Sequence, residues 1–137
     1  MYPAEIIAPM SKDLTVVGFE PLETPQEVEA VFENQTGTTL LVVNSVCGCA
    51  AAMARPGVKM ALQNEKQPEK LVTVFAGVDQ EATSKAREYL LPYPPSSPSI
   101  ALFKDGKLVH FIERHHIEGR SAMMIAENLK AAFNEYC

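Results

Sequence analysis

The chain has 137 residues, a length typical of one domain with a hydrophobic core of its own. Its net charge of −5 argues against a nucleic-acid-binding or membrane-surface protein, and no apolar run approaches the length of a membrane span. The first residues lack the basic and apolar segments of a signal peptide, so we expect one cytoplasmic domain over residues 1–137 without nucleic-acid or membrane partners.

The N-terminal segment over residues 2–14 carries apolar residues at helical intervals, which predicts a short helix. Pro9 lies inside this segment, and since proline lacks the N–H that continues a helix, we expect the helix to break there. Gly18 is typical of a helix end and is expected to lead into an extended segment, although residues 15–19 also fit a strand.

A second helix is predicted to begin at Thr24. Thr24 serves as the N-cap, Pro25 occupies the first helical position, and Glu27 stands where a capping box requires an acidic residue. Gly37 is expected to end this helix.

The central stretch joins a buried strand to an alanine-rich helix through two cysteines. Residues 38–43 form an uncharged run rich in β-branched side chains, as expected of a strand covered on both faces. Because residues 50–54 are strong helix formers, Cys47 falls at or just before a helix N-terminus, where free N–H groups and the helix dipole favour a thiolate. A thiol with a lowered pKa is nucleophilic near neutral pH. Further along, Pro56 and Gly57 predict a kink in the helix.

The spacing of Cys47 and Cys49 indicates redox chemistry. Residues two apart do not face each other on a helix, so a bond between these thiols requires Cys47 outside the helix and backbone freedom at Gly48. We expect such a small ring to hold a strained, easily reduced disulfide. The alternative is that two small cysteines simply pack beneath the helix.

The rest of the chain alternates between strands and helices. The predicted elements are a buried strand over residues 71–76, a helix capped by Asp79 that runs to Leu90, a rigid proline-rich loop over residues 91–98, a hairpin over residues 100–112 that turns at Asp105-Gly106, and an amphipathic helix over residues 119–136. This order predicts an α/β fold: a mixed β-sheet sandwiched by helices, with the cysteines at the carboxyl end of a central strand.

These landmarks resemble the thioredoxin fold. Cys47-Gly48-Cys49 takes the place of the usual Cys-x-x-Cys motif, and Pro56 takes the place of the helix-kinking proline. Ser97-Pro98 corresponds to the cis-proline loop of that fold, which implies a cis peptide bond there and a Ser97 backbone presented to the substrate disulfide.

Over nearly its whole length the chain resembles the bacilliredoxin family. The matching stretches are residues 37–51, 54–56, 73–77, 81–83, 96–99, 110–112, 114–115 and 117–119, together with Cys137. The blocks Asn-Ser-Val-Cys-Gly-Cys-Ala and Ala-Arg-Pro carry most of the specificity.

The family resemblance implies a thiol–disulfide oxidoreductase with no tightly bound cofactor. Its substrates would be bacillithiolated cytoplasmic proteins, with bacillithiol and other low-molecular-weight thiols as partners. Cys47 would attack the bacillithiol sulfur, and Cys49 would then displace bacillithiol and leave a Cys47–Cys49 disulfide.

Two other functions stay open at this stage. The chain is also compatible with a general weak disulfide isomerase, or with a protein that binds Cu(I) or Zn(II) through Cys47 and Cys49, with or without Cys137. His115-His116 could bind a metal ion or supply a proton near the thiolate. A partly buried or surface pair is the favoured interpretation, because no carboxylate or cysteine is recognised at ligand spacing around it. Arg55 is interpreted either as a source of positive potential at Cys47 or as a solvated cation.

Overall fold

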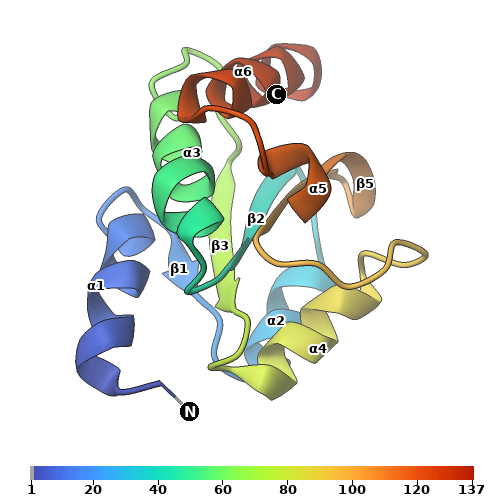
Figure 1. Cartoon of the computed structure of the whole chain (residues 1–137). Coiled ribbons are helices and arrows are strands. Elements are labelled where there is room, and N and C mark those ends of the chain that lie inside the picture. The colour runs from blue at the N-terminus through green and yellow to red at the C-terminus, as the bar shows by residue number, and fades with distance from the viewer. Residues whose placement is uncertain (1) are drawn as a thin grey trace.

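The computed structural model describes residues 2–137 and contains one five-stranded mixed sheet with helices on both faces (Figure 1). In spatial order the strands are β1 (Glu20–Pro21), β3 (Lys70–Phe75), β2 (Thr38–Asn44), β4 (Ser99–Lys104) and β5 (Lys107–Ile112). The first three strands run parallel, whereas β4 and β5 are antiparallel to their neighbours. This arrangement confirms the predicted α/β class and the antiparallel hairpin at one edge of the sheet.

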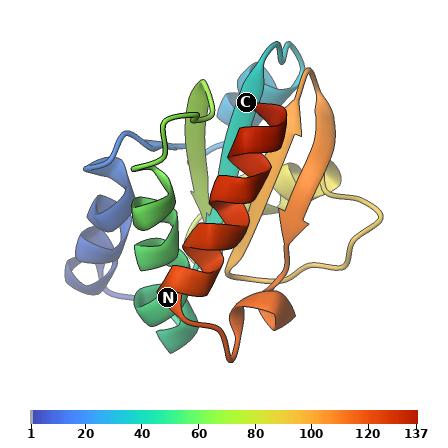
Figure 2. The same cartoon turned by 90° about the horizontal axis from the view of Figure 1, so that it is seen from above.

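The helices divide into two layers, seen on opposite sides of the sheet in Figure 2. One layer holds α1 (Ala4–Thr15), α3 (Arg55–Ala61) and α6 (Ala122–Tyr136), and the other holds α2 (Pro25–Phe32) and α4 (Gln80–Glu88). A short helix, α5 (Arg114–Ile117), connects β5 to α6. Among residues 2–137, no helix combines the length and apolar character that crossing a membrane requires.

Strand β2 is the centre of the core, and all seven of its residues are buried. Side chains alternate across a strand, so Leu40 and Val42 pack in the layer of α3 and α6, whereas Leu41 and Val43 pack in the layer of α2 and α4. A strand buried on both faces reads as a continuous apolar run, which is why the sequence predicts this element almost to the residue.

The hairpin turn also follows directly from the sequence. Asp105 and Gly106 both take positive φ values, 49° and 83°, as the two central residues of a type I′ turn do. Gly37, expected to end the second helix, lies beside this turn instead: α2 ends at Phe32, and the Gly37 N–H donates to Oδ1 of Asp105 at 2.7 Å.

Three helix predictions are corrected by the structure. Helix α1 continues through Pro9, because the Glu5 carbonyl left without a partner is on an exposed face and can bond to water. Asp79 occupies the N-cap position of α4 without a side-chain capping bond. The last helix begins at Ala122 after the N-cap Ser121, whose side chain accepts a hydrogen bond from the Met124 N–H.

The expected kink around Pro56 takes the form of a wider helical turn. Residues Ala50–Ala54 form a π-helical turn, η1, closed by a hydrogen bond from the Arg55 N–H to the Ala50 carbonyl. Pro56 follows in the first turn of α3, where a missing N–H is tolerated. Gly57 serves close packing: a Cβ there would lie 2.8 Å from Cγ2 of Ile125 and 3.0 Å from the Ala122 carbonyl oxygen of α6.

We therefore expect Gly57→Ala to lower the free energy of unfolding by about 1–3 kcal/mol, because α6 must move to admit the methyl group. Gly48→Ala is the matched control, since a Cβ at Gly48 meets nothing within 4 Å apart from its chain neighbours and the backbone of its own helix, and alanine favours a helix by roughly 0.5–1 kcal/mol. Urea unfolding of both reduced variants measures the difference. Equal stability of the two would contradict the close approach of α3 and α6.

Candidate active site

The two neighbouring cysteines lie where the chain leaves the central strand and enters a helix. The Cys47 carbonyl accepts hydrogen bonds from the N–H groups of Ala50 and Ala51, at 3.1 and 3.3 Å, so the helix begins just after Cys47. Cys47 and Cys49 are half-buried, and Gly48 between them is exposed. This placement agrees with Cys47 lying just before a helix N-terminus, as the sequence predicts.

The Cys47 thiol is surrounded by hydrogen-bond donors. Its Sγ lies 2.7 Å from Sγ of Cys49, and both residues are free thiols in this structure. Although burial alone raises the pKa of Cys47, hydrogen bonds from the Cys49 thiol, the Ser45 hydroxyl and the N–H groups of Ala50 and Cys49 lower it below its ordinary value. Cys47 is thus the thiol that ionises first.

Cys49 has the opposite character. Burial raises the pKa of the Cys49 thiol, and so do its hydrogen bond to Cys47 and the negative charge that develops there. The two thiols therefore differ in character: their shared hydrogen bond favours the negative charge on Cys47 and the proton on Cys49.

Cys47 and Cys49 are free thiols in this structure, so the backbone freedom expected at Gly48 for a disulfide stays a prediction. Gly48 belongs to the first helical turn and lies outside the five glycines with left-handed backbone, so the dithiol form needs no unusual backbone freedom at this position. A Cβ there would point into open space, clear of the other described residues.

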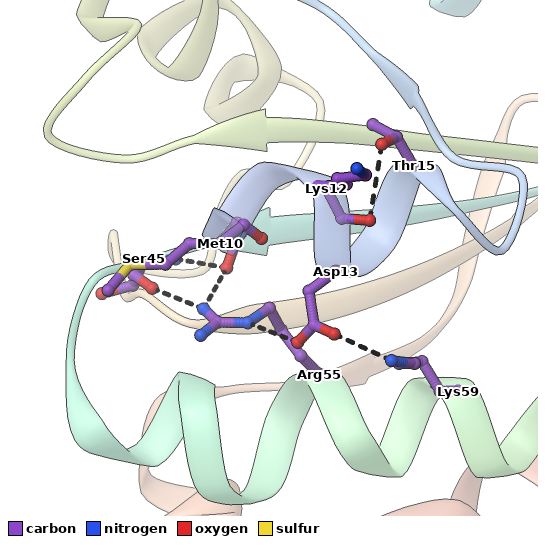
Figure 3. A network of polar contacts seen from close by, with 8 residues as sticks. Met10, Lys12, Asp13, Thr15, Ser45, Arg55 and Lys59 are labelled. Carbon is purple, nitrogen blue, oxygen red and sulfur yellow. Dashed lines mark hydrogen bonds and ion pairs between the residues drawn. The ribbon is translucent and has the colours of Figure 1, made fainter. Parts of the chain in front are cut away.

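Arg55 lies beneath the cysteine segment as a buried cation, with 4% of its surface exposed (Figure 3). Its Nη1 donates to Oδ1 of Asn44 and to the carbonyl oxygen of Ser45, both at 2.9 Å. Its Nε donates to Oδ2 of Asp13 at 3.1 Å. The interpretation of Arg55 as a solvated cation is therefore wrong; this residue holds the end of β2 from which Cys47 projects.

Helix α1 completes the same network from the N-terminal side. Asn44 donates through Nδ2 to the Met10 carbonyl at 3.2 Å, and its Oδ1 accepts a hydrogen bond from the Ser45 N–H at 2.8 Å. Asp13 also pairs with Lys59 at 2.8 Å, and this hydrogen bond, more than that of Arg55, holds the pKa of Asp13 below its ordinary value against the effect of burial. The first helix of the chain thus fixes the segment before the cysteines (Figure 3).

The Ser97–Pro98 peptide bond is cis, as the family resemblance implies, and the Leu91–Pro92 bond, which carried no such expectation, is cis as well. Ser99 pairs with Val43 across β2 and β4, so the residues before Ser99 lie at the end of β2 that leads to Cys47. The strand register therefore places Ser97 and Pro98 at the same end of the strands as the two cysteines.

Arg114 is the site residue that sequence reasoning missed. Its Nη1 donates to the Ser97 carbonyl at 3.0 Å, and its backbone N–H approaches the Ser96 hydroxyl at 3.4 Å. Its charge lies close enough to both thiols to lower the pKa of Cys49 against the raising effect of burial. The only sequence signal was its position in a matching stretch, because a contact across 17 residues leaves no local pattern.

Cys137 does not join the other two cysteines. It lies near Thr38, at the start of β2, and burial raises its pKa while a hydrogen bond from Thr38 lowers it. Because Cys47 follows the opposite end of β2, Cys137 cannot complete a three-thiol metal site with Cys47 and Cys49 in this chain. The argument that no carboxylate accompanies His115 and His116 is also wrong, since Glu113 lies beside them.

Known proteins match this chain over nearly its whole length. The family described as "Disulphide isomerase" matches residues 2–137. A bacilliredoxin of Cytophaga hutchinsonii is 62% identical over 98% of this chain and 99% of its own, and one of Halalkalibacterium halodurans is 54% identical over 99% and 94%.

Solved structures show the fold. Fasciola hepatica thioredoxin superposes with a TM-score of 0.59 at 17% identity, covering 87% of this chain and all of its own. Mitochondrial thioredoxin 3 of Saccharomyces cerevisiae, in its oxidised form, gives 0.58 at 18% identity, covering 87% and 96%. The predicted thioredoxin-like fold is confirmed.

Removing the Arg55 side chain is expected to destabilise the protein by about 2–3 kcal/mol, because Arg55→Ala leaves the buried acceptors on Asn44 and Ser45 short of a donor. Lys59→Ala is the control: it removes a half-exposed partner of the same Asp13 and should cost less than about 1 kcal/mol. Urea unfolding gives both values. If Lys59→Ala were the more destabilising change, the buried network would not be what holds this segment.

Neutralising Arg114 is expected to raise the pKa of Cys49, because the cation that favours its thiolate is lost. The titration of thiolate absorbance should move to higher pH in Arg114→Gln and largely return in Arg114→Lys, which keeps the charge. Arg120→Gln removes an exposed positive charge elsewhere in the same segment and serves as the control. An equal shift in the Arg120 variant would show a general charge effect instead of a local one.

Proposed function

Since the chain belongs to the bacilliredoxin family of thiol–disulfide oxidoreductases, we propose that it removes bacillithiol from mixed disulfides on cytoplasmic proteins. The observation that carries this proposal is the division of tasks between the two thiols. Cys47 has a lowered pKa and Cys49 a raised one, with their sulfur atoms 2.7 Å apart. Such a pair supplies one thiolate for the first attack and one thiol for a second attack.

In the first step the Cys47 thiolate attacks the bacillithiol sulfur of the mixed disulfide. The bond between that sulfur and the substrate protein breaks, and the substrate cysteine leaves as a thiolate that takes a proton from solvent. Cys47 now carries bacillithiol in a mixed disulfide, and no net oxidation has occurred. The exposed Gly48 leaves room for the incoming disulfide, and Ser97 and Pro98 border its approach.

The second step uses Cys49. Once Cys47 is bonded to bacillithiol it no longer carries the negative charge that helped to raise the pKa of Cys49, so Cys49 ionises more readily. Arg114 favours the same ionisation. The Cys49 thiolate attacks Sγ of Cys47 and expels bacillithiol as a thiolate, which leaves a Cys47–Cys49 disulfide. Two electrons from other cellular thiols return this disulfide to the dithiol, so the cycle requires no bound cofactor.

General disulfide isomerisation is the second candidate, because the family that matches residues 2–137 is described by that activity. The same Cys47 thiolate would then attack a disulfide between two protein cysteines. An isomerase ends its cycle in the dithiol form, because the rearranged substrate keeps its disulfide. The proposed cycle instead ends each turnover with a Cys47–Cys49 disulfide.

A trapping experiment tests the proposed order of attack. Reduced Cys49→Ala protein, mixed with a bacillithiolated test protein, should release reduced test protein and retain one bacillithiol on Cys47, identified by intact mass and peptide mapping. The Cys47→Ala variant should transfer far more slowly, and Cys137→Ala should behave like the wild type. An adduct found on Cys49 or Cys137 in matching single-cysteine variants would show that the roles are misassigned.

Substrate preference separates the two candidates. We expect the wild-type protein to reduce a bacillithiol mixed disulfide faster than it restores activity to a protein with scrambled disulfides, with both rates measured at the same enzyme concentration. Cys49→Ala should lose the multiple-turnover reaction with bacillithiolated protein while keeping its single transfer. The opposite rate order in the wild type would favour the isomerase.

A further inference from the structure

In the segment between β5 and α6, three side chains with metal-ligating atoms lie together outside the cysteine site. These are Glu113, at the N-cap position of α5, and His115 and His116 within it. One ligand atom from each residue lies within 4.8 Å of the other two. We propose that these three residues form a binding site for a borderline divalent cation of the Zn²⁺ type, separate from the redox pair.

The spacing of two of the ligands already fits a metal ion. Nε2 of His115 lies 3.5 Å from Oε2 of Glu113. Two ligands that bind one tetrahedral Zn²⁺ at the usual bond lengths lie roughly 3.4 Å apart. The third ligand is close as well, since the ring centroids of His115 and His116 are 4.0 Å apart. The two exposed histidine rings are the parts of this cluster that can turn toward one ion.

The donor set selects the class of cation. Two imidazole nitrogens and one carboxylate oxygen suit Zn²⁺, Co²⁺, Ni²⁺ or Cu²⁺, whereas Ca²⁺ and Mg²⁺ prefer oxygen ligands alone. Three protein ligands leave the remaining coordination positions to water. The Glu113 side chain is 12% exposed, so the carboxylate is held in place and its charge is poorly screened, while the His115 side chain is 69% exposed and free to turn.

The local charges permit a cation here. Arg114 and Arg120 are the positive residues within the segment, and the Arg114 guanidinium is already engaged with the Glu118 carboxylate and the Ser97 carbonyl. Nδ1 of His116 accepts a hydrogen bond from the Glu113 N–H at 3.1 Å, so this nitrogen carries a lone pair on the side of the cluster. A metal ion that takes this lone pair displaces the hydrogen bond, and the loss of that bond opposes part of the binding free energy.

A bound cation would tie down the segment that reaches the redox site. Arg114 lies between the ligands in the sequence and contacts the loop of the cis Ser97–Pro98 bond. Metal binding to the folded protein should therefore raise its melting temperature as the metal concentration rises above the dissociation constant.

The test removes all competing thiols. A full-length variant with Cys47, Cys49 and Cys137 replaced by alanine is titrated with Co²⁺, followed by its visible absorption, and with Zn²⁺ in competition. We expect one saturable site. Its metal affinity should fall by roughly tenfold or more in His115→Ala, His116→Ala and Glu113→Gln. His110→Ala is the matched control, because His110 is the remaining histidine of the chain and its ring bonds to Asn128 outside the cluster.

Each outcome is decisive. Saturable binding that survives in the His110 variant and fails in the other three, together with a metal-dependent rise in melting temperature, supports the site. No saturable binding, or binding that the His115 and His116 variants leave unchanged, overturns it. Circular dichroism of each variant confirms that the fold is kept. Since the cysteine-free background cannot exchange disulfides, the result is independent of the proposed bacillithiol reaction.

Discussion

The buried guanidinium of Arg55 is the interaction on which the geometry of the site depends. Desolvating a cation is costly unless hydrogen bonds replace its water, and Arg55 finds them in Asn44, in the Ser45 carbonyl and in Asp13. These partners come from α1, from the end of β2 and from the segment before Cys47. One charged group therefore holds three separate parts of the chain in a fixed arrangement. This arrangement positions the segment that leads to Cys47.

Local geometry also explains how a thioredoxin-like fold supports thiol–disulfide exchange when a single residue separates its two cysteines. The helix begins immediately after Cys47, so that its first N–H groups face the thiol of Cys47, and the π-helical turn that follows accommodates Pro56 without loss of the helix. Arg114 adds a positive charge from a distant segment, and it connects the thiols with the cis-proline loop. The reactivity of the pair thus belongs to the surrounding backbone and cations as much as to the sulfur atoms.

Sequence patterns predicted the parts of this protein that are governed by short-range rules. The β2 and β3 strands are continuous apolar runs, the hairpin turns at Asp105-Gly106, and Thr24 starts α2 with its capping box, as expected. The sequence could not show contacts between residues that are distant along the chain. Examples are the hydrogen bond of Arg55 to Asp13, which lies 42 residues away, and the close approach of Gly57 to Ile125. Glu113 went unnoticed for a different reason, since its spacing from the histidines has no common motif and becomes meaningful only with α5 in place.

The position of Cys137 at the far end of β2 gives the molecule two chemically distinct thiol faces. Electrophiles react with thiolates, and the lowered pKa of Cys47 contrasts with the raised pKa of Cys137. The thiolate form is therefore favoured at the end of β2 that leads to Cys47 and disfavoured at the end beside Cys137. A second molecule, a surface or a fluorophore coupled through Cys137 would stand on the side away from the incoming substrate.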